Sequence, residues 1–358
     1  MITEQQVLAA LSQVHDPDLG KDLVSLRMIQ DLQIEGKKIR FRIVLTTPAC
    51  PVKDAMQQAC INAIHMMVDP EAEVEIQMDA QTTSRRQDNK VILPEVSNII
   101  AVASGKGGVG KSTISTNLAL AIAQRGAKVG LMDADIYGPS IPIMLGIKGE
   151  RPRMAQIKGR PMIVPMLRFG IEVMSIGLLV DEKQAVIWRG PMASSAVRQF
   201  MTDIYWGALD YLIIDLPPGT GDIHLTLVQQ VPLTGAIVVT TPQDVALADA
   251  RKALGMFNTP QIKVPVIGVV ENMAYFTPPD LPDRKYYLFG RGGGQKLAEE
   301  FGVPFLGQIP IVENIREGGD IGVPAMVSDD EISRKAFESF ADQAIRSIAR
   351  LNASLQPA

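Results

Sequence analysis

The feature that most restricts the fold of this chain is a glycine-rich loop between an apolar run and a helix-like stretch. Residues 99–103 are apolar, the loop GKGGVGKS follows at 105–112, and residues 114–125 have a helical pattern. Glycines let successive backbone N–H groups curve around a phosphate without Cβ clashes, and the N-terminus of the next helix adds partial positive charge. The pattern predicts a phosphate-binding loop in which Lys111 reaches the terminal phosphates and the Ser112 hydroxyl suits Mg²⁺.

Apolar strands, turns and helical patterns alternate after this loop. Continuous apolar strands that alternate with helices form parallel sheets covered on both faces. We therefore expect an α/β fold with a doubly wound, mainly parallel sheet, a hairpin over 161–175 and a last helix over 329–351. The expected strands are residues 99–103, 129–133, 211–215, 235–240, 266–270 and 305–309.

The pattern of the first 81 residues predicts that they form a separate, small α+β domain. Its expected elements are a helix that starts after Thr3, strands at 28–34 and 38–45, a helix at 52–67 and a strand at 72–78. Residues 82–97 are polar in their first half and carry a proline in their second, which is typical of a linker. The remaining residues, 98–358, would form the domain that holds the phosphate-binding loop.

Composition narrows the expected partners and compartment. The net charge is −4, and we expect no nucleic-acid partner, because nucleic-acid-binding domains usually carry a basic surface. The chain has no run of about 18 apolar residues, so we expect no membrane span. Two cysteines and the lack of a signal-peptide pattern at the start predict a reducing, cytoplasmic location.

Three aspartates follow apolar strands at the edge where ligands bind in open α/β sheets. Asp133 and Asp135 close the strand at 129–133, and Asp215 follows four apolar residues, as in a Walker B motif. We expect Asp133 and Asp215 to hold Mg²⁺ together with Ser112, and Asp135 to orient the attacking water. Alternatively, the aspartates form strand-end turns or cap helices.

The loop from Lys106 to Thr113 resembles the deviant Walker A motif of the ParA/MinD class of NTPases. The resemblance implies that Lys106 contacts phosphate across an ATP-linked homodimer, with Lys111 and Asp135 as the other catalytic residues. It also implies that Asn272 reads adenine, although Asn272 could simply end its strand. The residues expected to contact ATP are Gly105, Lys106, Gly107, Gly108, Val109, Gly110, Lys111, Ser112, Thr113 and Asn272.

Within that class, the sequence is similar to the Mrp-type (ApbC-like) iron–sulfur cluster carrier ATPases. The N-terminal unit resembles the small PaaD-like domain of iron–sulfur assembly, which many bacterial Mrp-type proteins carry. The resemblance implies slow ATP hydrolysis, and transfer of clusters to apoproteins together with assembly factors. The segments that carry it are residues 16–20, 22–24, 45–51, 133–140, 188–192, 215–222, 271–273, 289–294, 307–310 and 315–319.

The cysteines of this chain depart from the family pattern. Mrp-type carriers usually hold a cluster with a Cys-x-x-Cys pair shortly after Glu-Asn-Met, whereas residues 274–283 contain no cysteine. Cys50 precedes a predicted helix, whose N-terminus favours the thiolate, and is a candidate iron–sulfur ligand. Cys60 falls within that helix, where we expect a buried, inert thiol.

Other functions remain open at this stage. The chain could hold a cluster itself, or it could regulate assembly without holding one. A positioning or partition ATPase of the ParA/MinD kind would use the same loop, but the C-terminus lacks a basic amphipathic membrane helix. A metabolic kinase would need an acceptor-substrate site, which we do not find in the sequence.

Overall fold

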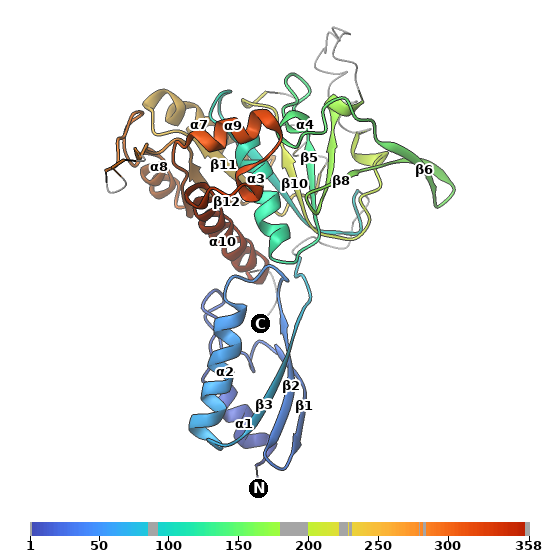
Figure 1. Ribbon diagram of the computed structural model, residues 1–358, viewed down its shortest axis with the longest axis vertical. Coiled ribbons are helices and arrows are strands. Elements are labelled where there is room, and N and C mark those ends of the chain that lie inside the picture. The colour runs from blue at the N-terminus through green and yellow to red at the C-terminus, as the bar shows by residue number, and fades with distance from the viewer. Residues whose placement is uncertain are drawn as a thin grey trace. The chain divides into compact units, whose positions relative to one another are not determined.

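The computed structural model describes residues 2–84, 92–179, 200–221, 228, 231–278, 280–281 and 284–354 (Figure 1). Its contacts divide the chain into two compact units, Met1–Thr83 with Ala349–Ala358, and Ser84–Ile348. The sequence assigned all of 98–358 to one domain, whereas the last residues group with the first unit. The reason is that Asn352 Nδ2 donates to the Thr83 carbonyl at 2.9 Å, and Arg350 pairs with Asp18 at 3.1 Å.

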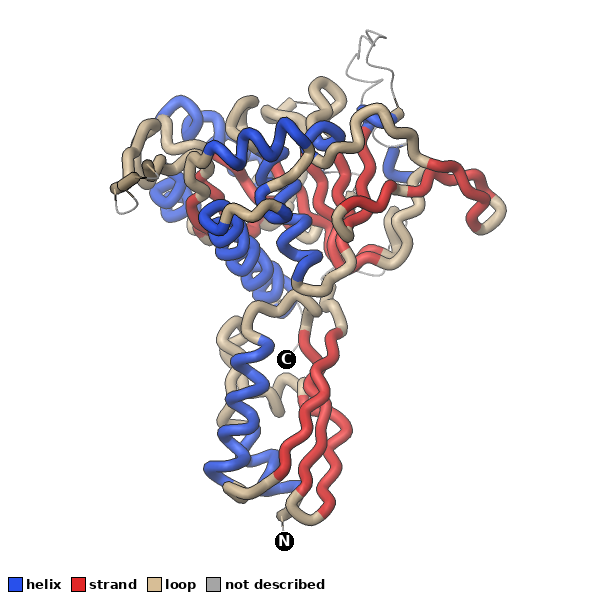
Figure 2. Tube along the Cα trace, in the orientation of Figure 1, coloured by secondary structure: helices blue, strands red, loops and turns tan. Residues whose placement is uncertain are grey.

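The first unit has a three-stranded sheet in the order β1-β2-β3. The central strand β2 pairs antiparallel with β1 and parallel with β3, and its residues alternate between buried and half-buried. Figure 2 shows α2 running along one face of this sheet. The elements are α1 (Glu4–Leu11), β1 (Ile29–Glu35), β2 (Lys38–Leu45), α2 (Lys53–Met67) and β3 (Glu73–Ala80), close to the predicted ranges.

The second unit is built on an eight-stranded sheet with the order β13-β12-β11-β4-β10-β5-β9-β8. All pairs are parallel except that of β8 with β9. The inner strands are buried along their length except at Ser97 of β4 and Asp210 of β10, as continuous apolar runs predict. The strands are β4 (Val96–Ser104), β5 (Val129–Asp133), β8 (Met166–Arg168), β9 (Ile171–Ser175), β10 (Leu209–Asp215), β11 (Gly235–Thr240), β12 (Val266–Glu271) and β13 (Phe305–Gln308).

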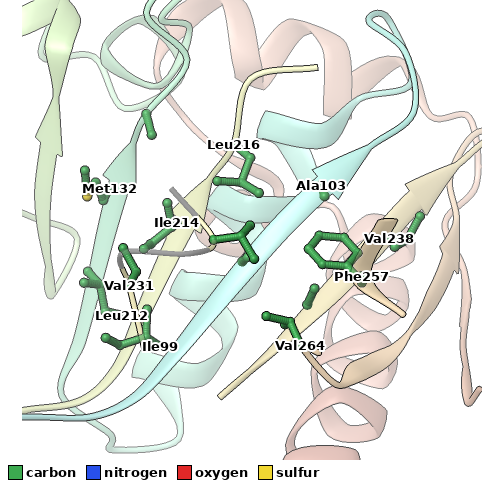
Figure 3. Close-up of a cluster of buried hydrophobic side chains, with 14 of the residues drawn as sticks. Ile99, Ala103, Met132, Leu212, Ile214, Leu216, Val231, Val238, Phe257 and Val264 are labelled. Carbon is green, nitrogen blue, oxygen red and sulfur yellow. The ribbon is translucent and has the colours of Figure 1, made fainter. Parts of the chain in front are cut away.

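Helices cover this sheet and close its core. Phe257 at the end of α7 is fully buried and lies near Val238 of β11, as Figure 3 shows. Helix α3 is buried on most sides, and Arg125 after its last turn pairs with Asp342 of α10 at 2.6 Å. The helices are α3 (Lys111–Gln124), α4 (Ile141–Met144), α7 (Asp244–Phe257), α8 (Gly293–Phe301), α9 (Glu313–Ile321) and α10 (Glu331–Ala353), with 3-10 turns at Ile176–Leu178 and Ala325–Val327.

The segment predicted as one hairpin over 161–175 belongs to two different hairpins. Strand β7 (Arg160–Val164) pairs with β6 (Arg153–Ile157), while β8 pairs with β9, which joins the large sheet beside β5. Glycines with positive φ, Gly159 and Gly170, make the two tight turns. Across the described part of the chain, no helix is both long and apolar enough to cross a membrane.

Candidate nucleotide site

The phosphate-loop pattern lies where the sequence placed it, between β4 and α3. Gly108 and Gly110 have φ values of 80° and 81°, which side chains with a Cβ adopt only with strain. Gly105 lies directly against the backbone of α7. A Cβ at this position would lie 2.1 Å from the Asp249 carbonyl carbon, so a larger residue does not fit without a shift. The loop is thus held between the sheet and α7, with the N-terminus of α3 directly after it.

Lys111 and Ser112 both meet Asp215 at this helix N-terminus. The Lys111 Nζ lies 2.8 Å from Asp215 Oδ2, and the Ser112 hydroxyl donates to the same oxygen at 2.5 Å. Asp215 is fully buried and Lys111 is 6% exposed. The structure therefore brings together the lysine, hydroxyl and carboxylate that sequence spacing assigned to one site.

Ser115 is part of this cluster, and the sequence analysis missed it. Its buried hydroxyl donates to Asp215 Oδ1 at 2.6 Å, so that both oxygens of this carboxylate are held by serines of α3. The sequence spacing could have pointed to Ser115, because it lies one helical turn after Ser112 and so on the same face of the helix.

Asp133 has a different setting from the one its motif suggested. Its carboxylate is fully buried and accepts hydrogen bonds from the Ser175 hydroxyl at 2.9 Å and from the backbone N–H groups of Asp135 and Ile141 at 3.1 and 3.3 Å. Burial, and after it repulsion by Asp215, raises the pKa of Asp133 to about 7. These contacts fix the loop after β5, which carries Asp135.

Asp135 faces the same site from that loop. Its Oδ2 lies 4.0 Å from Lys111 Nζ, and its Oδ1 accepts from the backbone N–H groups of Tyr137 and Gly138 at 3.3 Å each. Burial raises the pKa of Asp135, while the charge of Lys111 acts in the opposite direction. The Asp135 side chain is 12% exposed, and so lies just beneath the surface of the site.

Lys106 differs from Lys111 in its surroundings. Lys106 is half-buried, and its ammonium group makes no ion pair or hydrogen bond with any residue that the structure describes. The Ser104 hydroxyl fixes its backbone by donating to the Lys106 carbonyl at 2.9 Å. The backbone of this lysine is thus positioned while its charge is not neutralised within the described chain.

Asn272 joins the phosphate loop to the end of β12. Its Nδ2 donates to the Val109 carbonyl at 2.9 Å, and it lines a cavity of about 630 Å³. Thr113 and Met273 also line this cavity, together with apolar side chains that include Leu288 and Ile315. The cavity is in the size range of ligand pockets and opens beside the N-terminus of α3.

Glu271 explains why three separate motifs accompany the loop. It is fully buried, and it accepts from the Gly294 N–H at the start of α8 and, at 2.7 Å, from Gln308 Nε2 of β13. A Cβ on Gly294 would come within 2.9 Å of the Glu271 Cβ, so glycine allows the close approach. The Glu-Asn-Met, glycine-rich and Gly-Gln-Ile-Pro segments are therefore one structural unit.

The two cysteines have different environments, and neither forms a disulfide. Cys50 is half-buried before α2, whereas Cys60 is fully buried and burial raises its pKa to about 12. Among the described residues, no three His, Cys, Asp or Glu side chains are grouped to hold a metal ion. The predicted segment 188–192 lies outside the described residues, as do Asp222 and Asp283.

Comparison with known proteins identifies the family of this chain. Residues 95–345 match the model of the NUBPL iron-transfer P-loop NTPase family, and residues 4–77 match that of iron-sulfur cluster assembly proteins. The chain is 50% identical to the iron-sulfur cluster carrier protein of Synechocystis sp. over 96% of this chain and 97% of the relative. It is 46% identical to the carrier protein of Deinococcus radiodurans, over 96% and 93% of the two chains.

A solved structure shares the fold of the second unit. It is a nucleotide-binding protein from Archaeoglobus fulgidus in complex with ADP, 41% identical, with a TM-score of 0.57 over 66% of this chain and 92% of that chain. The resemblance inferred from the motifs is thereby confirmed at the level of the family and the fold. The chain belongs to the NUBPL iron-transfer family of P-loop NTPases and carries an N-terminal iron-sulfur cluster assembly domain.

Proposed function

We propose that this protein binds ATP with Mg²⁺, hydrolyses it slowly, and uses the cycle to assemble iron–sulfur clusters or deliver them to apoproteins. The observation that supports this most directly is the set of contacts among Lys111, Ser112 and Asp215. A serine hydroxyl and a carboxylate are hard oxygen ligands, which Mg²⁺ prefers, so these residues fit the ion. Asp133 would act differently from expectation, by holding the loop that carries Asp135.

Each polar group would take one part in phosphoryl transfer. The loop N–H groups and Lys111 would bind the phosphates, and bound Mg²⁺ would supply neutralising charge at the β- and γ-phosphates. Asp135, beneath the surface beside Lys111, would orient the attacking water. The cavity beside Asn272 would take the base, with its apolar walls around the ring.

The iron–sulfur cluster would be the cargo of this cycle. The two relatives named above are called iron-sulfur cluster carrier proteins. Residues 98–358 contain no cysteine, so a thiolate ligand from this chain would be Cys50 or Cys60. Cys50 is the better candidate, because a pKa of about 12 leaves Cys60 without thiolate at neutral pH.

Substitution of the loop lysine tests the nucleotide part of the proposal. The Lys111→Ala variant should bind ATP and ADP at least about 100-fold more weakly, because it loses a buried, charge-assisted contact to phosphate. Calorimetric titration measures this, and phosphate release measures hydrolysis. Lys128→Ala is the matched control, since Lys128 is exposed and precedes β5 outside the site. Unchanged binding by Lys111→Ala would disprove the assignment.

The same preparations test the cargo part. After anaerobic reconstitution, the wild type should contain iron and sulfide and pass them to an apo-ferredoxin, while Cys50→Ala should lose most of both. The Lys111→Ala variant should still take up the cluster but should not respond to ATP. A wild type that takes up no cluster, beside a positive control that does, would leave an assembly regulator as the function.

A further inference from the structure

A second cavity, of about 310 Å³, lies in the second unit at the β6–β7 hairpin. Figure 1 shows this hairpin projecting beside the large sheet. The cavity is lined by residues 92–96, 157, 158, 160, 162, 201, 202 and 204–207, among them Val96, the first residue of β4. The phosphate loop follows Ser104, at the other end of β4, so the two sites lie at opposite ends of this strand.

The walls of this cavity combine apolar and polar side chains. Its volume is at the lower end of the range of small-molecule sites, roughly 300–1,000 Å³, in which apolar walls surround a few polar groups. The hairpin contributes one wall and the segment before β10 contributes another. The apolar side chains are Leu93, Ile157, Met162, Met201 and Ile204.

Two side chains at this cavity, the exposed Arg160 and the half-buried Tyr205, make no ion pair or side-chain hydrogen bond with any residue that the structure describes. The indole Nε1 of Trp206 also lacks a partner, but this atom is buried, so a ligand in the cavity does not reach it. Trp206 is only 3% exposed, although buried polar groups nearly always have a partner. Its Cζ3 lies over Gly130 of β5, where a Cβ would come within 2.8 Å, so the end of the ring that carries Nε1 is directed away from β5.

The charge balance of the cavity favours one negative charge. Lys158 is paired with Glu95, Nζ to Oε1, at 2.9 Å, which leaves Arg160 as the cation without a counter-ion. The planar guanidinium binds a carboxylate through two parallel hydrogen bonds. A doubly charged phosphate would exceed the single positive charge that remains.

We propose that this cavity binds a small amphipathic carboxylate. The carboxylate pairs with Arg160 at the mouth and accepts from the Tyr205 hydroxyl, and the hydrocarbon part lies against Ile157 and Met162. The site is separate from the nucleotide site, and its occupancy does not depend on the function proposed above.

Octanoate is a suitable probe, because it joins one carboxylate to a flexible apolar chain. The chain has two tryptophans, so the full-length Trp188→Phe variant leaves Trp206 as the only tryptophan fluorophore. Titration should change the Trp206 emission saturably, and calorimetry should give one site per chain. Neutral 1-octanol and the short carboxylate acetate should each bind at least tenfold more weakly.

Variants connect the binding to these residues. Arg160→Ala should weaken octanoate binding at least tenfold, and Tyr205→Phe, which keeps the ring but removes the hydroxyl, at least threefold by calorimetry. Arg153→Ala is the control, because Arg153 is exposed on the same face of the hairpin but does not line the cavity. Saturating MgADP should leave the affinity unchanged.

Three results would overturn the proposal. One is the lack of saturable octanoate binding by a folded protein that still binds MgADP. A second is equal weakening by Arg153→Ala and Arg160→Ala, which would indicate a diffuse charge effect. The third is displacement of octanoate by MgADP, which would place the probe in the nucleotide site.

Discussion

Asp215 shows how single residues prepare the nucleotide site before any ligand binds. Its two oxygens accept from Ser112 and Ser115, and the Lys111 ammonium compensates its charge. A buried carboxylate without such partners would be costly to the folded state. Because both hydroxyls come from the first turns of α3, folding of this helix places the carboxylate where the proposed function needs it.

Glu172 is a residue of the second unit whose charge the fold does not compensate. It lies on β9 between Gly130 and Leu167 of the neighbouring strands, and its Oε2 is buried without a hydrogen-bond partner. Burial raises its pKa above the ordinary value of 4.5. The folded state therefore holds this proton more tightly than the unfolded state, and stability falls as the pH rises from about 4.5 through the raised pKa.

We predict that Glu172→Gln stabilises the protein above that pKa. The gain should be roughly 0.5–1 kcal/mol at pH 8, because an amide avoids the cost of a buried charge that lacks a partner. It should shrink towards zero as the pH approaches 4.5. Urea unfolding across this pH range measures the effect, with the exposed Glu150→Gln as control. A gain independent of pH would contradict the electrostatic explanation.

At the scale of elements, the phosphate loop depends on its contact with α7. A Cβ on Gly105 would lie 2.2 Å from the carbonyl oxygen of Asp249 and 2.6 Å from the backbone nitrogen of Ala250. Both atoms belong to the helix backbone, which cannot rotate away as a side chain can. The loop and α7 would have to separate to make room.

We therefore predict that Gly105→Ala lowers the free energy of unfolding by about 2–3 kcal/mol, the upper part of the range for overpacking. Nucleotide binding should weaken with it, because the loop is displaced. Gly107→Ala is a control in the same loop, since its Cβ would meet nothing closer than 3.9 Å and its φ is not in the left-handed region. Denaturant unfolding that shows equal stability for the two variants would contradict the packing argument.

The elements differ in how far the sequence could predict them. The central strands were predictable because burial on both faces requires continuous apolar runs, as in β10 and β11. Strand β6 was missed because most of its side chains are exposed and leave no such pattern. The role of Glu271 could not be predicted either, since its partners lie 23 and 37 residues away and meet it only through the order of the strands.

At the scale of the whole molecule, the two units divide the proposed work. The second unit contains every residue of the candidate nucleotide site, while both cysteines belong to the first. Ala349–Ala358 groups with the first unit although α10 begins in the second. The chain thus passes between the two units twice, once after Thr83 and once within α10.

Lys106 carries the last prediction, which concerns assembly of the whole protein. Lys111 is neutralised within its own chain, whereas Lys106 has no partner among the described residues. An unpaired lysine on a fixed backbone is free to reach a phosphate held by a second copy, and we predict an ATP-linked homodimer. Lys106→Ala should therefore bind ATP within about threefold of the wild type as a monomer, but dimerise at least tenfold more weakly.

Light scattering after gel filtration measures this with a non-hydrolysable ATP analogue and, separately, with ADP. The wild type should dimerise with the analogue but not with ADP, and the control variant Lys128→Ala should behave like the wild type. If Lys106→Ala dimerises as the wild type does, the lysine acts within its own chain. If instead it loses nucleotide binding altogether, Lys106 is part of the phosphate site of the monomer, and a second chain is not needed to complete it.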